Sequence, residues 1–141
     1  MTIRSAIVDD APAVADLIVQ LGYSATVAEA ADRLERLLAR PDNDILVAVD
    51  DDRVVGFLHV SVSESIEGET TGEIRGLVVN EAHRSGGIGA QLVEAAEAWV
   101  RQQGVRKIRV RSNVKRERAR RFYERHGYIV VKTSNIFDKE L

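Results

Sequence analysis

Apolar residues recur along the chain at two different spacings, and the spacing changes from one segment to the next. Val14, Leu17, Ile18 and Leu21 recur every three or four positions, which is the period of an amphipathic helix, and Gly22 is typical of its end. Other segments, rich in Val and Ile, alternate apolar and polar residues with the period of two that characterises a strand. The chain is therefore expected to combine helices with a sheet.

The pattern predicts the order β-α-α-β-β-β-α-β-α-β-β, a mixed α/β fold. The predicted strands are Thr2–Ile7, Ile45–Val49, Val54–Val60, Glu73–Val79, Lys107–Arg111, Tyr128–Lys132 and Asn135–Lys139, and the predicted helices are 12–21, Val27–Ala39, Ile88–Gln103 and Lys115–His126. Residues 64–72 are expected to form a polar loop. The unit from Glu73 to Arg111 is one strand-helix-strand crossover, so its two strands are expected to run parallel.

Composition narrows the class of protein without naming a function. The 141 residues suit one domain covering 1–141, with 45% hydrophobic and 30% charged residues. A net charge of -2 argues against a molecule that is basic throughout and binds nucleic acid through its whole surface. The chain has no cysteine, which excludes disulfides and thiolate chemistry. With no membrane-length apolar run and no recognisable signal peptide, we expect a cytoplasmic protein and no membrane partner.

The stretch H-R-S-G-G-I-G-A, residues 83–90, lies between a predicted strand and a predicted helix. Three glycines in four positions allow another group to approach the backbone closely. The first amides of a helix have no partner within the helix and favour an anion, and an arginine just ahead adds two donors for oxyanions. The expected anion-binding residues are Arg84, Gly86, Gly87, Ile88, Gly89 and Ala90.

This combination indicates a diphosphate ligand, although a plain sharp turn before a helix remains the alternative. The P-loop pattern is excluded because no Lys-Ser/Thr pair follows the glycines. The dinucleotide fingerprint expects a glycine three residues after Gly89, where this sequence has Leu92.

Arg84-x-x-Gly87-x-Gly89, after the strand E-I-R-G-L-V-V, resembles the acetyl-coenzyme A motif of the GNAT superfamily of N-acetyltransferases. Residues 112–128, S-N-V-K-R-E-R-A-R-R-F-Y-E-R-H-G-Y, resemble the second cofactor segment of that family. The resemblance implies a fold in which the fourth and fifth strands splay apart, and acetyl-coenzyme A as donor with coenzyme A as product. It also implies cofactor contacts at Leu77, Val78, Val79, Asn113, Ala119 and Tyr123.

The same resemblance implies catalytic roles for two side chains. Glu73 lies where family members often carry the base that deprotonates the amine, and Tyr123 resembles the general acid that protonates the departing thiolate. A solvated carboxylate at Glu73 and a core aromatic at Tyr123 are the structural alternatives. Tyr23 and Glu64 are candidate contacts to the acceptor, and the acidic residues of 64–69 are expected to attract a cationic amine.

The acceptor itself stays open at this point. The favoured function is transfer of acetyl to a primary amine of a small molecule. The alternatives are acetylation of a protein N-terminus or lysine, a non-catalytic module that senses acyl-coenzyme A, and a nucleic-acid-binding domain that uses the cations of 101–125. The three histidines lack metal-ligand spacing, and His59 is expected to pack or line a pocket. Family members often form dimers, so a homodimer is a further expectation left open.

Overall fold

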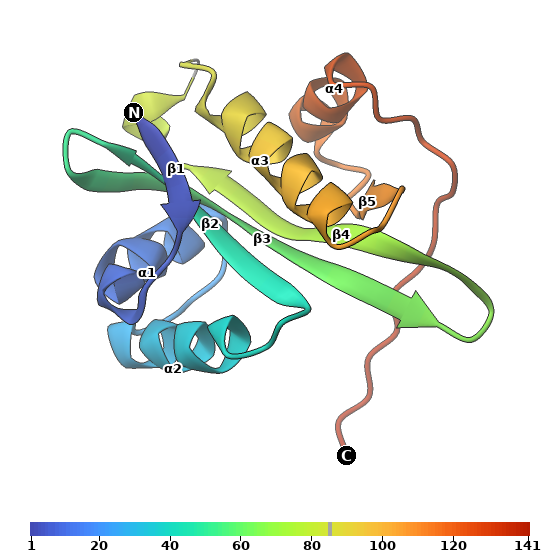
Figure 1. The fold of residues 1–141 in the computed structure, drawn as a ribbon, viewed down its shortest axis with the longest axis horizontal. Helices are drawn as coiled ribbons and strands as arrows, with labels where there is room; N and C mark the ends of the chain where they lie inside the picture. The colour runs from blue at the N-terminus through green and yellow to red at the C-terminus, as the bar shows by residue number, and fades with distance from the viewer. Residues whose placement is uncertain (85) are drawn as a thin grey trace. The chain divides into compact units, whose positions relative to one another are not determined.

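The computed structural model describes residues 1–84 and 86–141, which form two compact units, residues 1–111 and residues 112–141. The described part of the first unit contains a five-stranded sheet in the order β1-β2-β3-β4-β5 and the helices α1, α2 and α3 (Figure 1). The second unit contains the helix α4 (Glu117–Arg125). That 1–141 is one domain stays a prediction.

The sheet is mixed, as the sequence predicts. Its strands are β1 (Thr2–Ser5), β2 (Asn43–Asp50), β3 (Arg53–Ser65), β4 (Gly68–Val79) and β5 (Ile108–Val110). Neighbours from β1 to β4 are antiparallel, and β5 is parallel to β4. The helix α3 (Ile88–Gln102) connects these two parallel strands, which confirms the predicted crossover.

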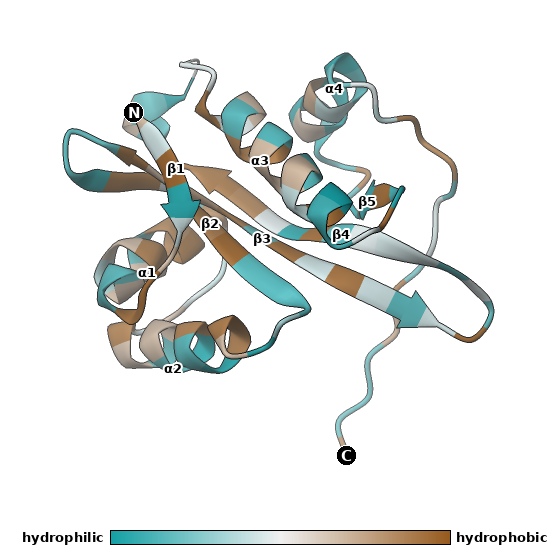
Figure 2. Cartoon of the chain, in the orientation of Figure 1, coloured by the Kyte–Doolittle hydropathy of each residue, from teal (hydrophilic) through white to brown (hydrophobic). Residues whose placement is uncertain are grey.

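Helices cover both faces of the sheet in the first unit. On one face, α1 (Ala11–Gln20) and α2 (Val27–Leu38) bury a core that includes Leu17, Leu34 and Phe57. On the other face lies α3, since a Cβ built on Gly56 would lie 3.4 Å from the side chain of Leu92. Successive residues of a strand point to opposite faces, so Gly56 faces α3 whereas Phe57 faces α1 and α2. Figure 2 shows the hydrophobic stretches along these central strands.

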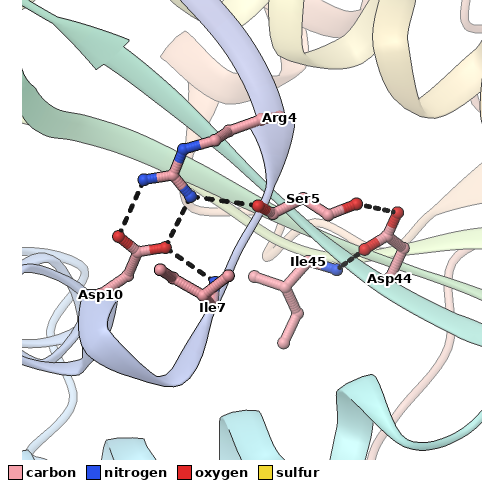
Figure 3. A network of polar contacts seen from close by, with 6 residues as sticks. All are labelled: Arg4, Ser5, Ile7, Asp10, Asp44 and Ile45. Carbon is pink, nitrogen blue, oxygen red and sulfur yellow. Dashed lines mark hydrogen bonds and ion pairs between the residues drawn. The ribbon is translucent and has the colours of Figure 1, made fainter.

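An ion pair between Arg4 and Asp10 connects the edge strand β1 to the start of α1. The carboxylate of Asp10 accepts hydrogen bonds from Arg4 Nη1 at 2.8 Å and Nη2 at 3.0 Å, and from the backbone N–H of Ile7 at 2.8 Å (Figure 3). Asp10 is buried, and the guanidinium of Arg4 is the main reason that its pKa lies below the ordinary value. On the same strand, the hydroxyl of Ser5 donates to Asp44 of β2 at 2.9 Å.

The two hairpins of the sheet differ in how well the sequence predicts them. Asp51 and Asp52 adopt φ values of 50° and 61°, which suit the tight turn expected between β2 and β3. The predicted loop at residues 64–72 is wrong, because β4 already begins at Gly68 and Thr71 pairs with Ser63. Threonines fit a paired strand well, so β3 and β4 extend to a short turn around Ile66.

The two strands predicted at Tyr128–Lys132 and Asn135–Lys139 are also wrong, since these described residues form no strand. Ile129 and Phe137 are 79% and 89% exposed. A run of β-formers becomes a strand only when a neighbouring strand takes its N–H and C=O groups. The fold class is as predicted, and the helices and strands before residue 112 occur in the predicted order, with β3 and β4 longer than expected.

Candidate active site

The fourth and fifth strands of the sheet pair over a short stretch and then part. The register joins Gly72 to Ile108, Glu73 to Arg109 and Ile74 to Val110. Beyond Ile74, β4 continues to Val79 with β3 on one side. Among the described residues no strand pairs with its other side, so residues 75–79 present an open strand edge.

Backbone groups on this open edge alternate in direction. The N–H of Asn80 donates to the carbonyl oxygen of Val55 at 2.7 Å, which sets the phase of the antiparallel pairing with β3. By that alternation, the backbone of Val78 faces β3, whereas those of Leu77 and Val79 face the open edge. The Val79 oxygen accordingly accepts a hydrogen bond from Arg84 Nε at 3.3 Å. Leu77 and Val79 therefore offer backbone partners to an extended ligand.

A glycine turn opens α3 shortly after β4. Gly87 is the N-cap residue with φ +77°, a left-handed conformation that favours glycine. The N–H groups of Gly87, Ile88, Gly89 and Ala90 come before the first α-helical hydrogen bond, which runs from Gln91 N to the Gly87 oxygen at 3.1 Å. Gly86 has room for a side chain, because a Cβ there would make an ordinary 3.5 Å contact with the His83 oxygen.

A hollow of about 450 Å³ adjoins this helix N-terminus. Its lining includes Arg84, Gly86 and Ile88 from the turn, together with Met1 and Asp50. Arg84 is exposed. An exposed guanidinium beside helix amides that precede the first α-helical hydrogen bond has the chemistry of an anion site, so the residues present fit the diphosphate that the sequence indicates.

Glu73 is buried at the point where β4 and β5 part. Its side chain is 6% exposed, and its two oxygens lie 3.2 Å from Arg75 Nη1 and 3.2 Å from Arg111 Nη2. Arg75 Nε also donates to the hydroxyl of Ser61, on β3, at 3.0 Å. Glu73 is therefore no solvated carboxylate, and either oxygen must exchange a guanidinium, or reach through water, to take a proton.

The residues expected to contact the acceptor are more dispersed. Tyr23 follows α1 and is 68% exposed. Glu64 is exposed near the end of β3, and Glu69 is paired with Lys107. The expected acidic surface is thus partly neutralised within the first unit.

His59 lines an apolar pocket of about 140 Å³ under α1 and α2, as the sequence predicts for a pocket-lining residue. Its Nε2 lies 2.7 Å from Asn43 Oδ1. Burial, and after it the charge of Arg75, lowers the pKa of His59 to about 4. The ring is therefore neutral at pH 7.

Three expected site residues belong to the unit 112–141. Asn113 Oδ1 accepts a hydrogen bond from the Lys115 N–H at 2.9 Å and so stabilises the turn before α4. Ala119 and Tyr123 lie in α4. The Tyr123 ring packs edge-on against Phe122 and Tyr128, with centroids 5.2 Å and 5.6 Å apart, and burial raises its pKa to about 12.

Sequence reasoning missed Ser61, Arg75 and Arg111. One clue was present, since Arg75 follows Glu73 by two residues in a strand and so shares its face. The contribution of Arg111 depends on the register of β4 with β5, which no local pattern reveals. Within residues 1–84 and 86–141, no cluster of metal-ligating side chains and no helix able to span a membrane is found.

A parallel pair of strands that parts beside a glycine turn is the arrangement that the sequence resemblance implies, and comparison with known proteins agrees. The model described as the acetyltransferase (GNAT) family matches residues 13–128. The chain belongs to this family, which confirms the resemblance seen in the sequence.

One curated relative is an aminoalkylphosphonate N-acetyltransferase of Salmonella typhimurium, 35% identical over 92 residues. The match spans 64% of this chain and only 60% of that protein. Among solved structures, an aminoglycoside 6'-N-acetyltransferase from Acinetobacter haemolyticus superposes with a TM-score of 0.86 at 21% identity, over 100% of this chain and 99% of that one. Glucosamine-6-phosphate N-acetyltransferase from Arabidopsis thaliana gives 0.80 at 22% identity, over 97% and 98%. At these identities the solved structures establish the fold alone.

Proposed function

We propose that this chain is an acetyl-coenzyme A-dependent N-acetyltransferase that acetylates a primary amine of a small molecule by direct transfer in a ternary complex. The observation that carries the proposal is the Gly87 turn, which leaves four helix amides and Arg84 beside an open strand edge. Diphosphate suits the amides, and an extended amide-bearing arm suits the edge. The Salmonella typhimurium relative, by its name, acts on small amines, which supports this acceptor class.

Acetyl-coenzyme A is bound mainly by backbone groups of the chain. Arg84 and the amides of residues 87–90 bind the diphosphate, and Leu77 and Val79 pair with the pantetheine arm as an added strand would, beside Val78. Asn113 and Ala119 supply the further contacts that the family resemblance implies. A backbone N–H on the open edge, at Leu77 or Val79, stabilises the thioester oxygen as negative charge develops on it.

On the acceptor side, proton transfers accompany the change of bonds. Acetyl-coenzyme A supplies the acetyl thioester, and a C–N bond to the amine forms as the C–S bond breaks. Glu73, through water, takes a proton from the ammonium group, since only about one alkylamine in a few thousand is neutral at pH 7. Tyr123 donates a proton to the departing thiolate, and its high pKa keeps the phenol protonated until then. The nitrogen loses its second proton to water as the amide forms, and water returns a proton to the Tyr123 phenolate, so that one proton in all is released through Glu73. Tyr23 and Glu64 are the more distant candidates for acceptor contact.

The first test is calorimetric titration with acetyl-coenzyme A, with coenzyme A and NAD as comparators. Micromolar binding of acetyl-coenzyme A without NAD binding is expected. The double variant Arg84→Ala/Gly87→Trp abolishes that binding, whereas Arg101→Ala, at the far end of α3, leaves it unchanged. Retained binding in the double variant would overturn the assignment of the glycine turn.

The second test measures thiol release with a panel of amines. Tyr123→Phe is expected to lower the rate about 100-fold, the low end of general acid catalysis, with acetyl-coenzyme A affinity unchanged. Turnover confined to peptides would indicate a protein acetyltransferase. Binding with no turnover would indicate a sensor, and steep salt-dependent affinity for an oligonucleotide without cofactor binding would indicate a nucleic-acid-binding domain.

A further inference from the structure

The polar cluster around Glu73 lies on the face of the sheet opposite α3. A Cβ built on Gly72 would lie 2.4 Å from Val100 of α3, so Gly72 faces that helix and Glu73 faces away from it. Arg75 follows two residues later on the same strand, and Arg111 directly follows the last paired residue of β5, Val110. The cluster therefore lies at the apex where the pairing of β4 with β5 ends. Figure 1 shows these two strands.

The two guanidinium groups are fixed by the protein but not covered by it. The side chains of Arg75 and Arg111 are 48% and 66% exposed, whereas that of Glu73 is 6% exposed. Ser61 and Glu73 engage Nε and Nη1 of Arg75, and a guanidinium has five N–H donors in all. Each arginine thus combines a defined orientation with surface that a ligand can reach.

The charges at this apex favour an anion. One carboxylate faces two guanidinium groups, which leaves one net positive charge. Further along the same strands the Glu69–Lys107 pair cancels, and Arg109, in register with Glu73, adds a positive charge. His59, whose pKa Arg75 helps to lower, is neutral. Glu67 lies in the hairpin turn, six residues or about 20 Å along the strand from Glu73. Glu64 is exposed and lies three residues from Ser61, the partner of Glu73, or about 10 Å along the strand. Both distances exceed the screening length of about 8 Å at physiological ionic strength, so neither carboxylate reverses this sign.

We infer that Arg75 and Arg111, oriented by Glu73, bind an oxyanion group of the acceptor, so that the acceptor is a small amine that also carries a carboxylate, phosphonate or phosphate. This inference rests on the proposed function, because the strand apex is where the amine is proposed to react. It argues against an acceptor with several positive charges, although the acidic residues of 64–69 are expected to attract a cationic amine. Guanidinium forks bind such oxygens through two parallel hydrogen bonds, which distinguishes them from a neutral or cationic substituent.

The test compares amines of one length with different ends: 3-aminopropylphosphonate, 4-aminobutanoate, 3-aminopropanol and 1,3-diaminopropane. Calorimetric titration into the protein saturated with coenzyme A measures their binding without requiring turnover. At least tenfold tighter binding of an anionic amine than of 3-aminopropanol is expected. Equal or tighter binding of 3-aminopropanol or 1,3-diaminopropane would overturn the inference.

Arginine variants show which side chains cause the preference for anionic amines. Arg75→Gln is expected to remove the preference for the anionic amine and leave 3-aminopropanol and coenzyme A binding unchanged, whereas Arg101→Gln keeps the preference. Because Arg75 partners a buried carboxylate, the more exposed Arg111→Gln serves as a second variant should Arg75→Gln fail to fold. An anion preference that survives in the folded variants would contradict the assignment.

Turnover separates this inference from the function it rests on. If anionic amines bind with the expected preference and no amine in the panel releases thiol, the acetyltransferase proposal fails and the anion site stands. If thiol is released as fast with 3-aminopropanol as with the anionic amines, the chain is an acetyltransferase, but the proposed oxyanion site at Arg75 and Arg111 is wrong.

Discussion

Asp10 gathers three hydrogen bonds on one buried carboxylate, and two of them come from a single guanidinium. Hydrogen bonds to a charged group contribute about 1.5–3 kcal/mol. Asp10→Asn removes the charge but keeps the size, so we expect the free energy of unfolding to fall by about that amount at pH 7. Urea titration measures it, and Asp9→Asn, at an exposed neighbour, should change it by less than about 0.5 kcal/mol.

The same prediction has a pH dependence of defined sign. The pKa of Asp10 is lower in the folded chain than in the unfolded chain, so its stabilisation is complete above about pH 5 and is lost as pH falls through the folded value. The difference between wild type and Asp10→Asn should therefore shrink below about pH 4. A difference as large at pH 3 as at pH 7, or one that is absent at pH 7, would contradict the role given to this carboxylate.

Single residues also define what the sequence can reveal about the site. Arg84 and Gly87 stand out because a glycine cluster is unusual in any context, and the structure gives Gly87 the conformation that explains it. Arg75 and Arg111 do not stand out, since exposed arginines are common and their meeting at Glu73 depends on strand register. The roles of Glu73 and Tyr123 in catalysis stay predictions.

At the scale of elements, α3 packs on the sheet so closely that Gly72 has no room for a side chain. A Cβ there would lie 2.4 Å from Cγ2 and 2.8 Å from Cγ1 of Val100, and a branched valine cannot easily turn away. Gly72→Ala is expected to lower the free energy of unfolding by about 1–3 kcal/mol. In a Val100→Ala background most of that cost should disappear, because the colliding methyl groups are gone.

Gly68→Ala is the matched control, on the same strand. Its Cβ would lie 3.9 Å from Ser65 Oγ, an ordinary contact, so stability should be nearly unchanged. Urea unfolding of wild type, Gly72→Ala, Val100→Ala and the double variant gives the coupling free energy between the two positions. An equal cost of Gly72→Ala in both backgrounds would refute the close approach of α3.

Elements also separate what local pattern predicts from what it does not. The apolar spacing and the terminal residues of helices such as α2 and α3 are local features of their own sequence. The sequence therefore predicts the bounds of these helices to within a residue or two. The strand at Gly68 and the missing strands after Tyr128 depend on a partner segment. Thr71 is paired although its neighbourhood is polar, and Val131 is unpaired although its neighbourhood is apolar.

For the whole molecule, stability in mild acid is expected to depend on one ring. His59 has a pKa of about 4 in the folded chain, against about 6.5 when unfolded. The unfolded chain therefore binds the proton first, and stability present above about pH 6.5 is lost as pH falls toward 4. The difference between these pKa values corresponds to a loss of at most about 3 kcal/mol.

The window from pH 6.5 to 5 isolates this effect, because the carboxyl groups whose pKa values are lowered, Asp10, Glu29, Asp42 and Glu69, matter only in more acidic solution. Urea unfolding at several pH values should show the decline in wild type and in His126→Gln, an exposed control, but not in His59→Gln. If His59→Gln declines as steeply as wild type, another group carries the acid sensitivity. If the decline disappears in His59→Gln, the buried neutral imidazole beside Arg75 is the group that makes the folded chain sensitive to mild acid.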